Sequence, residues 1–287
     1  MRNFQIKNKR LFTFGCSFTE YIWPTWADIL GQQHEYFENW GMAGAGNLYI
    51  FNSIIEANQR HKFTKEDTVI IMWSGLNRVD YYHTNNWCPQ GGEFVFDKTD
   101  ITGYEVINYA YIDAVIKLFE ATGMNYKMLS LAGFTKKGKV YDLYRSSIDE
   151  ITNYPYNFGK KIINVDKNKI QKTYYYNLIE NNYNRNKGLS WPNFDKFFFD
   201  PDLKLDKNIK LEIEKCMENF TQGFKLMRNG VEFWDYHPTP KEHLISLNKL
   251  FPSYEIYPST LTWVNRFEEM VLAPNYILYK TNLPERL

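Results

Sequence analysis

A short run of apolar residues, Thr68–Trp73, places the strongest limit on what this chain can fold into. The run holds no charged residue and is bounded by Asp67 and Gly75. An uninterrupted apolar run of this length is typical of a strand buried on both faces, as in parallel sheets covered by helices on either side. The first half of the chain alternates such runs with helical patterns, which predicts an α/β fold.

The other expected elements follow the same alternation. We expect strands at residues 11–14, 36–40, 68–73, 126–131 and 231–234, and helices at 26–33, 47–59, 104–122 and from 239 onward. About a hundred residues separate the last two expected strands, more than one crossover helix needs. We therefore divide the chain into an α/β core at 1–132 and 231–250, an insertion or cap subdomain at 133–230, and a C-terminal extension at 251–287.

Charge and cysteine usage restrict the partners. The chain has 34 Lys and Arg against 33 Asp and Glu, so it offers no global attraction for nucleic acid or an anionic membrane. Its three cysteines, Cys16, Cys88 and Cys216, fit neither a disulfide framework nor a zinc site, so we expect free thiols, no metal and no other cofactor. With a polar N-terminal segment, cytoplasmic localisation is expected, and the Lys- and Asn-rich composition suits a bacterial or phage gene.

Four motifs that can carry chemistry follow expected strands. Ser17, within Gly-Cys-Ser-Phe-Thr, follows the first strand, and the glycine-rich residues 41–46 follow the second. Asn77 follows the third, and Asp235 and His237 follow the fifth. Each motif alone has a plain structural interpretation, such as a helix cap or a surface turn. Because the carboxyl ends of parallel strands meet at one edge of a sheet, their convergence there favours an active site.

These residue types fit acyl transfer. A serine at a strand end exposes its hydroxyl and its backbone N–H, and small residues let a second backbone N–H approach a ligand oxygen. A carboxylate two residues from an imidazole can hold one ring nitrogen while the other nitrogen faces a nucleophile.

In their order and placement the four motifs resemble the SGNH (GDSL-like) hydrolase superfamily. The resemblance covers about half of the chain and implies a three-layer α/β/α sandwich around a five-stranded parallel sheet of order 2-1-3-4-5. It also implies a serine esterase in which Ser17 is the nucleophile, His237 the base and Asp235 the residue that orients the base. The oxyanion hole would consist of the Ser17 and Gly44 backbone N–H groups and the Asn77 side chain.

The chain departs from the pattern of that superfamily at three places. Cys16 stands where an aspartate is common, and only one residue separates Asp235 from His237 where many members have two. Arg78 follows Asn77 where an aspartate is frequent. Its positive charge beside the expected oxyanion site would favour an anionic substrate, so Arg78 is a candidate substrate-binding residue.

The predicted function is hydrolysis of an O-acyl ester, with O-acetyl first among them, on a carbohydrate or similar small polar substrate. One alternative is an O-acyltransferase with the same triad, and another is a non-catalytic binding or assembly module of the same fold. Neither nucleic acid nor a membrane is an expected partner, and an oligomer or protein partner would contact residues 133–230 or 251–287. His243 is interpreted as a structural histidine rather than a second base.

Overall fold

A computed structural model describes residues 6, 9–76, 78–83, 86–90, 101–131, 133–134, 136–155, 224–228, 231–235 and 237–272. The chain divides into two compact units. The first comprises Met1–Pro155, His237–Ala273 and Leu278–Leu287, and the second comprises Tyr156–Tyr236 and Pro274–Ile277.

A parallel sheet of five strands forms the centre of the first unit, as the sequence predicts. In spatial order the strands are β2 (Tyr36–Asn39), β1 (Arg10–Phe14), β3 (Thr68–Trp73), β6 (Asn125–Ser130) and β7 (Ile151–Asn153). All four neighbouring pairs are parallel. Numbered along the chain, this is the order 2-1-3-4-5. Every residue of β3 is buried, which confirms the expectation of a central strand covered on both faces.

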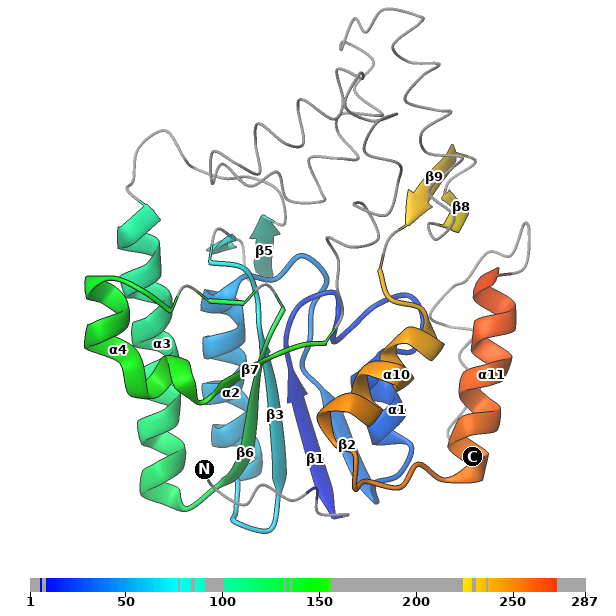
Figure 1. The fold of residues 1–287 in the computed structure, drawn as a ribbon, viewed down its shortest axis with the longest axis horizontal. Helices are drawn as coiled ribbons and strands as arrows, with labels where there is room; N and C mark the ends of the chain where they lie inside the picture. The colour runs from blue at the N-terminus through cyan, green and yellow to red at the C-terminus, as the bar shows by residue number, and fades with distance from the viewer. Residues whose placement is uncertain are drawn as a thin grey trace, which may run out of the picture. The chain divides into compact units, whose positions relative to one another are not determined.

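Helices cover both faces of the sheet (Figure 1). One layer contains α2 (Asn47–His61), α3 (Ile101–Thr122) and α4 (Lys139–Asp149), and the other contains α1 (Trp26–Gly31), α10 (Pro240–Leu250) and α11 (Pro258–Leu272). Alternate strand residues such as Phe12 and Ile71 share one buried cluster with Ile54 of α2, Ile112 of α3 and Ile148 of α4. The α/β fold class is therefore confirmed.

The fifth strand is not the one that the sequence analysis expects. Residues 231–234 lie in β9 (Val231–Asp235), which pairs antiparallel with β8 (Phe224–Arg228) in a separate two-stranded sheet of the second unit. The expectation was wrong because the dipeptide Asn229-Gly230 between them is a strong hairpin signal, which competes with addition to a parallel sheet. The fifth parallel strand is β7 instead, so the long insertion follows the last strand rather than preceding it.

Three further segments differ from the expected organisation. Residues 139–153, which were assigned to the insertion, form α4 and β7 of the first unit. β4 (Val79–His83) and β5 (Asn86–Gln90) form an antiparallel hairpin that the sequence analysis did not expect. Helix α11, in the expected C-terminal extension, belongs to the first unit and buries Trp263, Val264 and Phe267.

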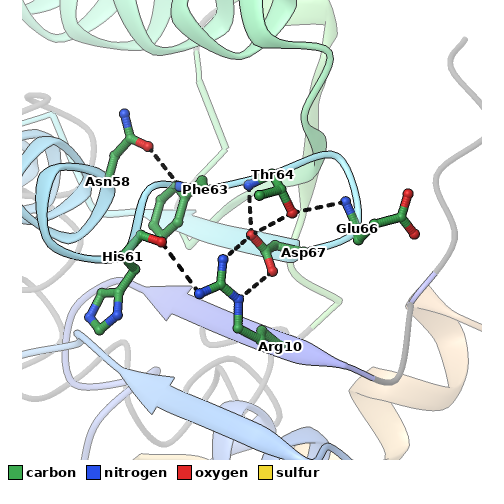
Figure 2. A network of polar contacts seen from close by, with 7 residues as sticks. All are labelled: Arg10, Asn58, His61, Phe63, Thr64, Glu66 and Asp67. Atoms are coloured by element: carbon green, nitrogen blue, oxygen red, sulfur yellow. Dashed lines mark hydrogen bonds and ion pairs between the residues drawn. The ribbon is translucent and has the colours of Figure 1, made fainter.

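A network of charged and polar groups links the amino ends of β1 and β3 (Figure 2). The Arg10 guanidinium donates from Nε and Nη2 to the two carboxylate oxygens of Asp67, each at 2.6 Å, and from Nη1 to the His61 carbonyl. The Thr64 backbone N–H also donates to Asp67. Burial alone would raise the pKa of Asp67, but the bonds from Arg10 and Thr64 outweigh it and lower the pKa.

Candidate functional site

The turn that carries Ser17 begins where β1 ends, at the opposite end of the sheet. A Cβ atom on Gly15 would lie 2.0 Å from Thr19 Oγ1 and 3.1 Å from the Met72 carbonyl oxygen, so only glycine fits there. The backbone N–H groups of Thr19 and Glu20 both donate to the Cys16 carbonyl, at 2.8 and 3.0 Å. This tight turn holds Ser17 at the carboxyl edge of the sheet, with its side chain only 6% exposed.

Neighbouring segments fix the same turn. The Thr19 carbonyl accepts a hydrogen bond from Thr25 Oγ1 at 2.6 Å and another from Asn39 Nδ2 at 2.7 Å. The Met42 backbone N–H donates to the Gly15 carbonyl at 3.0 Å. The serine turn is therefore joined to the end of β2 by the Asn39 side chain and to the glycine-rich segment by a backbone bond from Met42.

The structure brings His237 to Ser17 across 220 residues of sequence. Nε2 of His237 lies 2.9 Å from Ser17 Oγ. The hydroxyl can donate to Nε2 when the neutral imidazole carries its proton on Nδ1. Both residues belong to the first unit. A hydroxyl and an imidazole at this distance are placed for proton transfer from oxygen to nitrogen.

The segment around His237 is fixed by the start of α10. Thr239 caps that helix and forms a capping box with Glu242, and Pro240 occupies the first turn. The Pro238 carbonyl, next to His237, accepts a hydrogen bond from Nε1 of the buried Trp23 at 2.8 Å. The chain that follows His237 is thus held both by the start of α10 and by Trp23.

Aromatic rings surround the imidazole. Tyr21 stacks on His237 with ring centroids 3.9 Å apart and planes 22° apart. Phe18, next to Ser17, lies 5.5 Å from the same imidazole at a tilted angle. Sequence reasoning did not find Tyr21, although its position four residues after Ser17 places it on the same segment.

A second histidine lies behind this group. His243 is buried, and its Nδ1 is 2.7 Å from the hydroxyl oxygen of Tyr154, which is also buried. Burial first, and the neighbouring His237 second, lower the pKa of His243 well below its ordinary value. Burial likewise raises the pKa of Tyr154. His243 is therefore a neutral structural residue at ordinary pH.

Gly44 lies in the loop between β2 and α2, where it adopts a φ of +82° that favours glycine. This loop is clamped by the segment that follows β3. Asp80 accepts hydrogen bonds from the backbone N–H groups of Gly46 at 2.7 Å and Tyr49 at 2.9 Å, and Arg78 Nη1 donates to the Ala45 carbonyl at 3.1 Å. The Arg78 side chain thus contributes to fixing the loop. Burial raises the pKa of Asp80 against these two hydrogen bonds, which lower it.

The buried side-chain amide of Asn47 joins the loop between β2 and α2 to the segment that follows β3. Asn47, at the first position of α2, accepts from the Ser74 backbone N–H at 2.7 Å and donates to the Ser74 carbonyl at 3.1 Å. It also donates to Asn108 Oδ1 at 2.6 Å, and Asn108 donates to the Leu76 carbonyl at 3.3 Å. Gly46 occupies the cap position of the helix, so the Asn47 side chain is available for these contacts. Asn77 follows this fixed stretch and lies outside the described residues.

Two other expectations are not decided by the described residues. The Asp235 side chain lies outside them, and its backbone belongs to the second unit. Cys16 is a buried free thiol, whereas the side chains of Cys88 and Cys216 are not described. In the described part of the chain, no three His, Cys, Asp or Glu side chains are grouped so that they could hold a metal ion. None of the described helices combines the length and apolar character needed to cross a membrane.

Comparison with known proteins adds little to this geometry. No protein-family model matches the chain, and no curated protein matches it. Among solved structures, the crystal structure of a member of the lipolytic protein G-D-S-L family from Veillonella parvula DSM 2008 is similar over 55% of this chain and 82% of that chain. The two share 13% sequence identity with a TM-score of 0.28, a likeness too low to carry an argument about function.

Proposed function

We propose that the chain is a serine esterase that hydrolyses an O-acyl ester, O-acetyl first among them, on a carbohydrate or similar polar substrate. The observation that carries the proposal is the 2.9 Å separation between Ser17 Oγ and His237 Nε2 at the carboxyl edge of the parallel sheet. Open α/β sheets bind their ligands at this edge. A buried hydroxyl paired with an imidazole is the arrangement that nucleophilic acyl transfer requires.

In the proposed first half-reaction Ser17 Oγ attacks the ester carbonyl carbon while its proton moves to His237 Nε2. Asp235 would hold the Nδ1 proton and stabilise the imidazolium. The negative oxygen of the tetrahedral intermediate would accept hydrogen bonds from the backbone N–H groups of Ser17 and Gly44 and from the Asn77 side chain. When the intermediate collapses, the bond to the alcohol breaks, and His237 returns the proton to the departing oxygen.

The second half-reaction restores the serine. His237 takes a proton from water, the resulting hydroxide attacks the acyl carbon, and the carboxylic acid leaves as Ser17 recovers its proton. Arg78, close to the proposed oxyanion site through its bond to Ala45, would bring positive charge to a substrate with an anionic group.

The test combines a covalent probe with turnover of a simple ester. A fluorophosphonate should label the folded chain at Ser17, the Ser17→Ala variant should remain unlabelled, and p-nitrophenyl acetate should be hydrolysed by the wild type alone. Absence of labelling in folded wild-type protein would favour the non-catalytic module. Adding a glycan acceptor distinguishes the transferase, because acyl groups would then appear on the glycan faster than free acid appears.

A further inference from the structure

We propose that Tyr21 and Trp23 are positioning residues that hold the His237 imidazole against Ser17, an inference that rests on the proposed esterase function. Both come from the segment that continues directly from the serine turn. The nucleophile and the parts that fix its base are therefore carried by one short stretch of chain. Neither residue has a role in the triad or in the proposed oxyanion hole.

The stacking geometry restricts how the imidazole can turn. At 3.9 Å between centroids and 22° between planes, the Tyr21 ring lies nearly parallel to the His237 ring. Phe18 contacts the imidazole as well, at 5.5 Å. Rotation of the imidazole about its χ2 angle would turn its edge into the Tyr21 ring, so the stack keeps Nε2 directed at Ser17 Oγ. An aromatic face also attracts a cation, so the stack favours the imidazolium that forms during attack.

Trp23 acts on the backbone beside the base. Its indole is 1% exposed, and its Nε1 donates to the Pro238 carbonyl at 2.8 Å. Tyr21 and Trp23 also contact each other edge to face, with ring centroids 4.6 Å apart. The pair thus fixes both the plane of the imidazole and the position of the chain from which it projects.

Displacing a base by about 1 Å can cost about a hundredfold in rate, so loss of this support should appear in turnover. We expect Tyr21→Leu to lower kcat about tenfold to a hundredfold with little change in KM, because the substrate does not need the stack in order to bind. Tyr21→Phe keeps the stacking ring and should stay within about threefold of wild type. Trp23→Phe, which keeps an aromatic ring but removes the N–H donor, should lower kcat by a smaller factor.

The experiment measures fluorophosphonate labelling of Ser17 and p-nitrophenyl acetate turnover in these variants, with Tyr257→Leu as the matched control. Tyr257 is 44% exposed and precedes α11, so its replacement should change neither quantity. Thermal unfolding of each variant shows whether it remains folded. A Tyr21→Leu variant that folds and labels at the wild-type rate would overturn the inference while leaving the esterase proposal intact.

A second measurement does not depend on catalysis. The ring protons of His237, assigned by comparison with His237→Asn, should be shifted upfield in proton NMR spectra by the Tyr21 ring current. The shift should persist in Tyr21→Phe and disappear in Tyr21→Leu. If the wild type fails to react with the probe but shows this shift, the esterase proposal fails and the stacked arrangement stands. Absence of the shift in wild-type protein would overturn the positioning role itself.

Discussion

The two ends of the central sheet use polar side chains in opposite ways. At the amino ends of β1 and β3, Arg10 and Asp67 satisfy each other through two 2.6 Å bonds, with Asp67 only 3% exposed. At the carboxyl ends, Ser17 and His237 meet at 2.9 Å. A bidentate ion pair with further backbone partners stabilises the fold and cannot easily exchange a proton. A neutral hydroxyl beside an imidazole contributes little to stability, but it can transfer its proton to the ring nitrogen. One end is built for folding, and we propose that the other is built for chemistry.

The strongest way to break this comparison is to remove the nucleophile. Ser17→Ala should lower turnover of p-nitrophenyl acetate by about 10⁴-fold or more, because the acyl-enzyme can no longer form. The free energy of unfolding, measured by urea denaturation, should change by less than about 1 kcal/mol. A large loss of stability with retained activity would reverse the proposed roles of the two ends.

A smaller but still large effect is expected from Asn77, which we propose as an oxyanion-hole donor. Asn77→Ala should lower kcat by about 10²–10³-fold, the usual cost of losing one oxyanion-hole donor. KM should change little, since the donor acts mainly on charge that develops during attack. Steady-state kinetics with p-nitrophenyl acetate checks both quantities, and wild-type turnover in this variant would remove Asn77 from the proposed oxyanion hole.

The sequence predicted the fold because buried parallel strands have clear apolar signals. Ser17 follows such a strand, so its place at the carboxyl edge of the sheet was also predictable. The meeting with His237 was predicted on a wrong premise, because His237 follows β9, which lies outside the parallel sheet, and precedes α10. The sequence did not reveal β7, because this edge strand has three residues and only Ile151 is buried. Nor could it reveal Tyr21 or Asp80. Their roles depend on a ring stack and on backbone donors brought close by tertiary packing, which leave no periodic pattern in the sequence.

At the amino end of the sheet, loss of the Arg10–Asp67 pair should lower stability and leave catalysis unchanged. Arg10→Met keeps an aliphatic chain but leaves the buried Asp67 carboxylate without its guanidinium, which should lower the free energy of unfolding by about 2–3 kcal/mol. Turnover per folded molecule should match wild type. Urea denaturation at pH 7 measures the first quantity and steady-state kinetics the second; a drop in kcat comparable to that of Asn77→Ala would show that the two ends are not independent.

The stability that the Arg10–Asp67 pair contributes should also depend on pH. Because the pKa of Asp67 is lowered in the folded protein, the stabilisation is present above the unfolded value of about 3.9 and is lost as pH falls through the folded value. In Arg10→Met the same carboxyl is buried without its guanidinium, so its pKa lies higher than in wild type. The excess stability of wild type over Arg10→Met should therefore shrink as pH falls from the pKa of the variant towards the lower pKa of wild type. An excess that stays constant between pH 7 and about pH 3 would assign the effect to another group.

The smallest effect concerns His243, whose lowered pKa makes the proposed active end sensitive to milder acid. Below about pH 6.5 the unfolded chain binds a proton at this imidazole while the folded chain does not, so stability falls as pH decreases. The slope from this single group cannot exceed about 1.4 kcal/mol per pH unit. In His243→Gln the loss of stability between pH 7.5 and 5.5 should be smaller than in wild type by about 1 kcal/mol, measured by urea denaturation at each pH. Parallel curves would mean that the pKa of His243 is the same in the folded and unfolded protein, which its burial beside Tyr154 and His237 opposes. The two ends would then differ only in their bonds, and not in the pH range over which each responds.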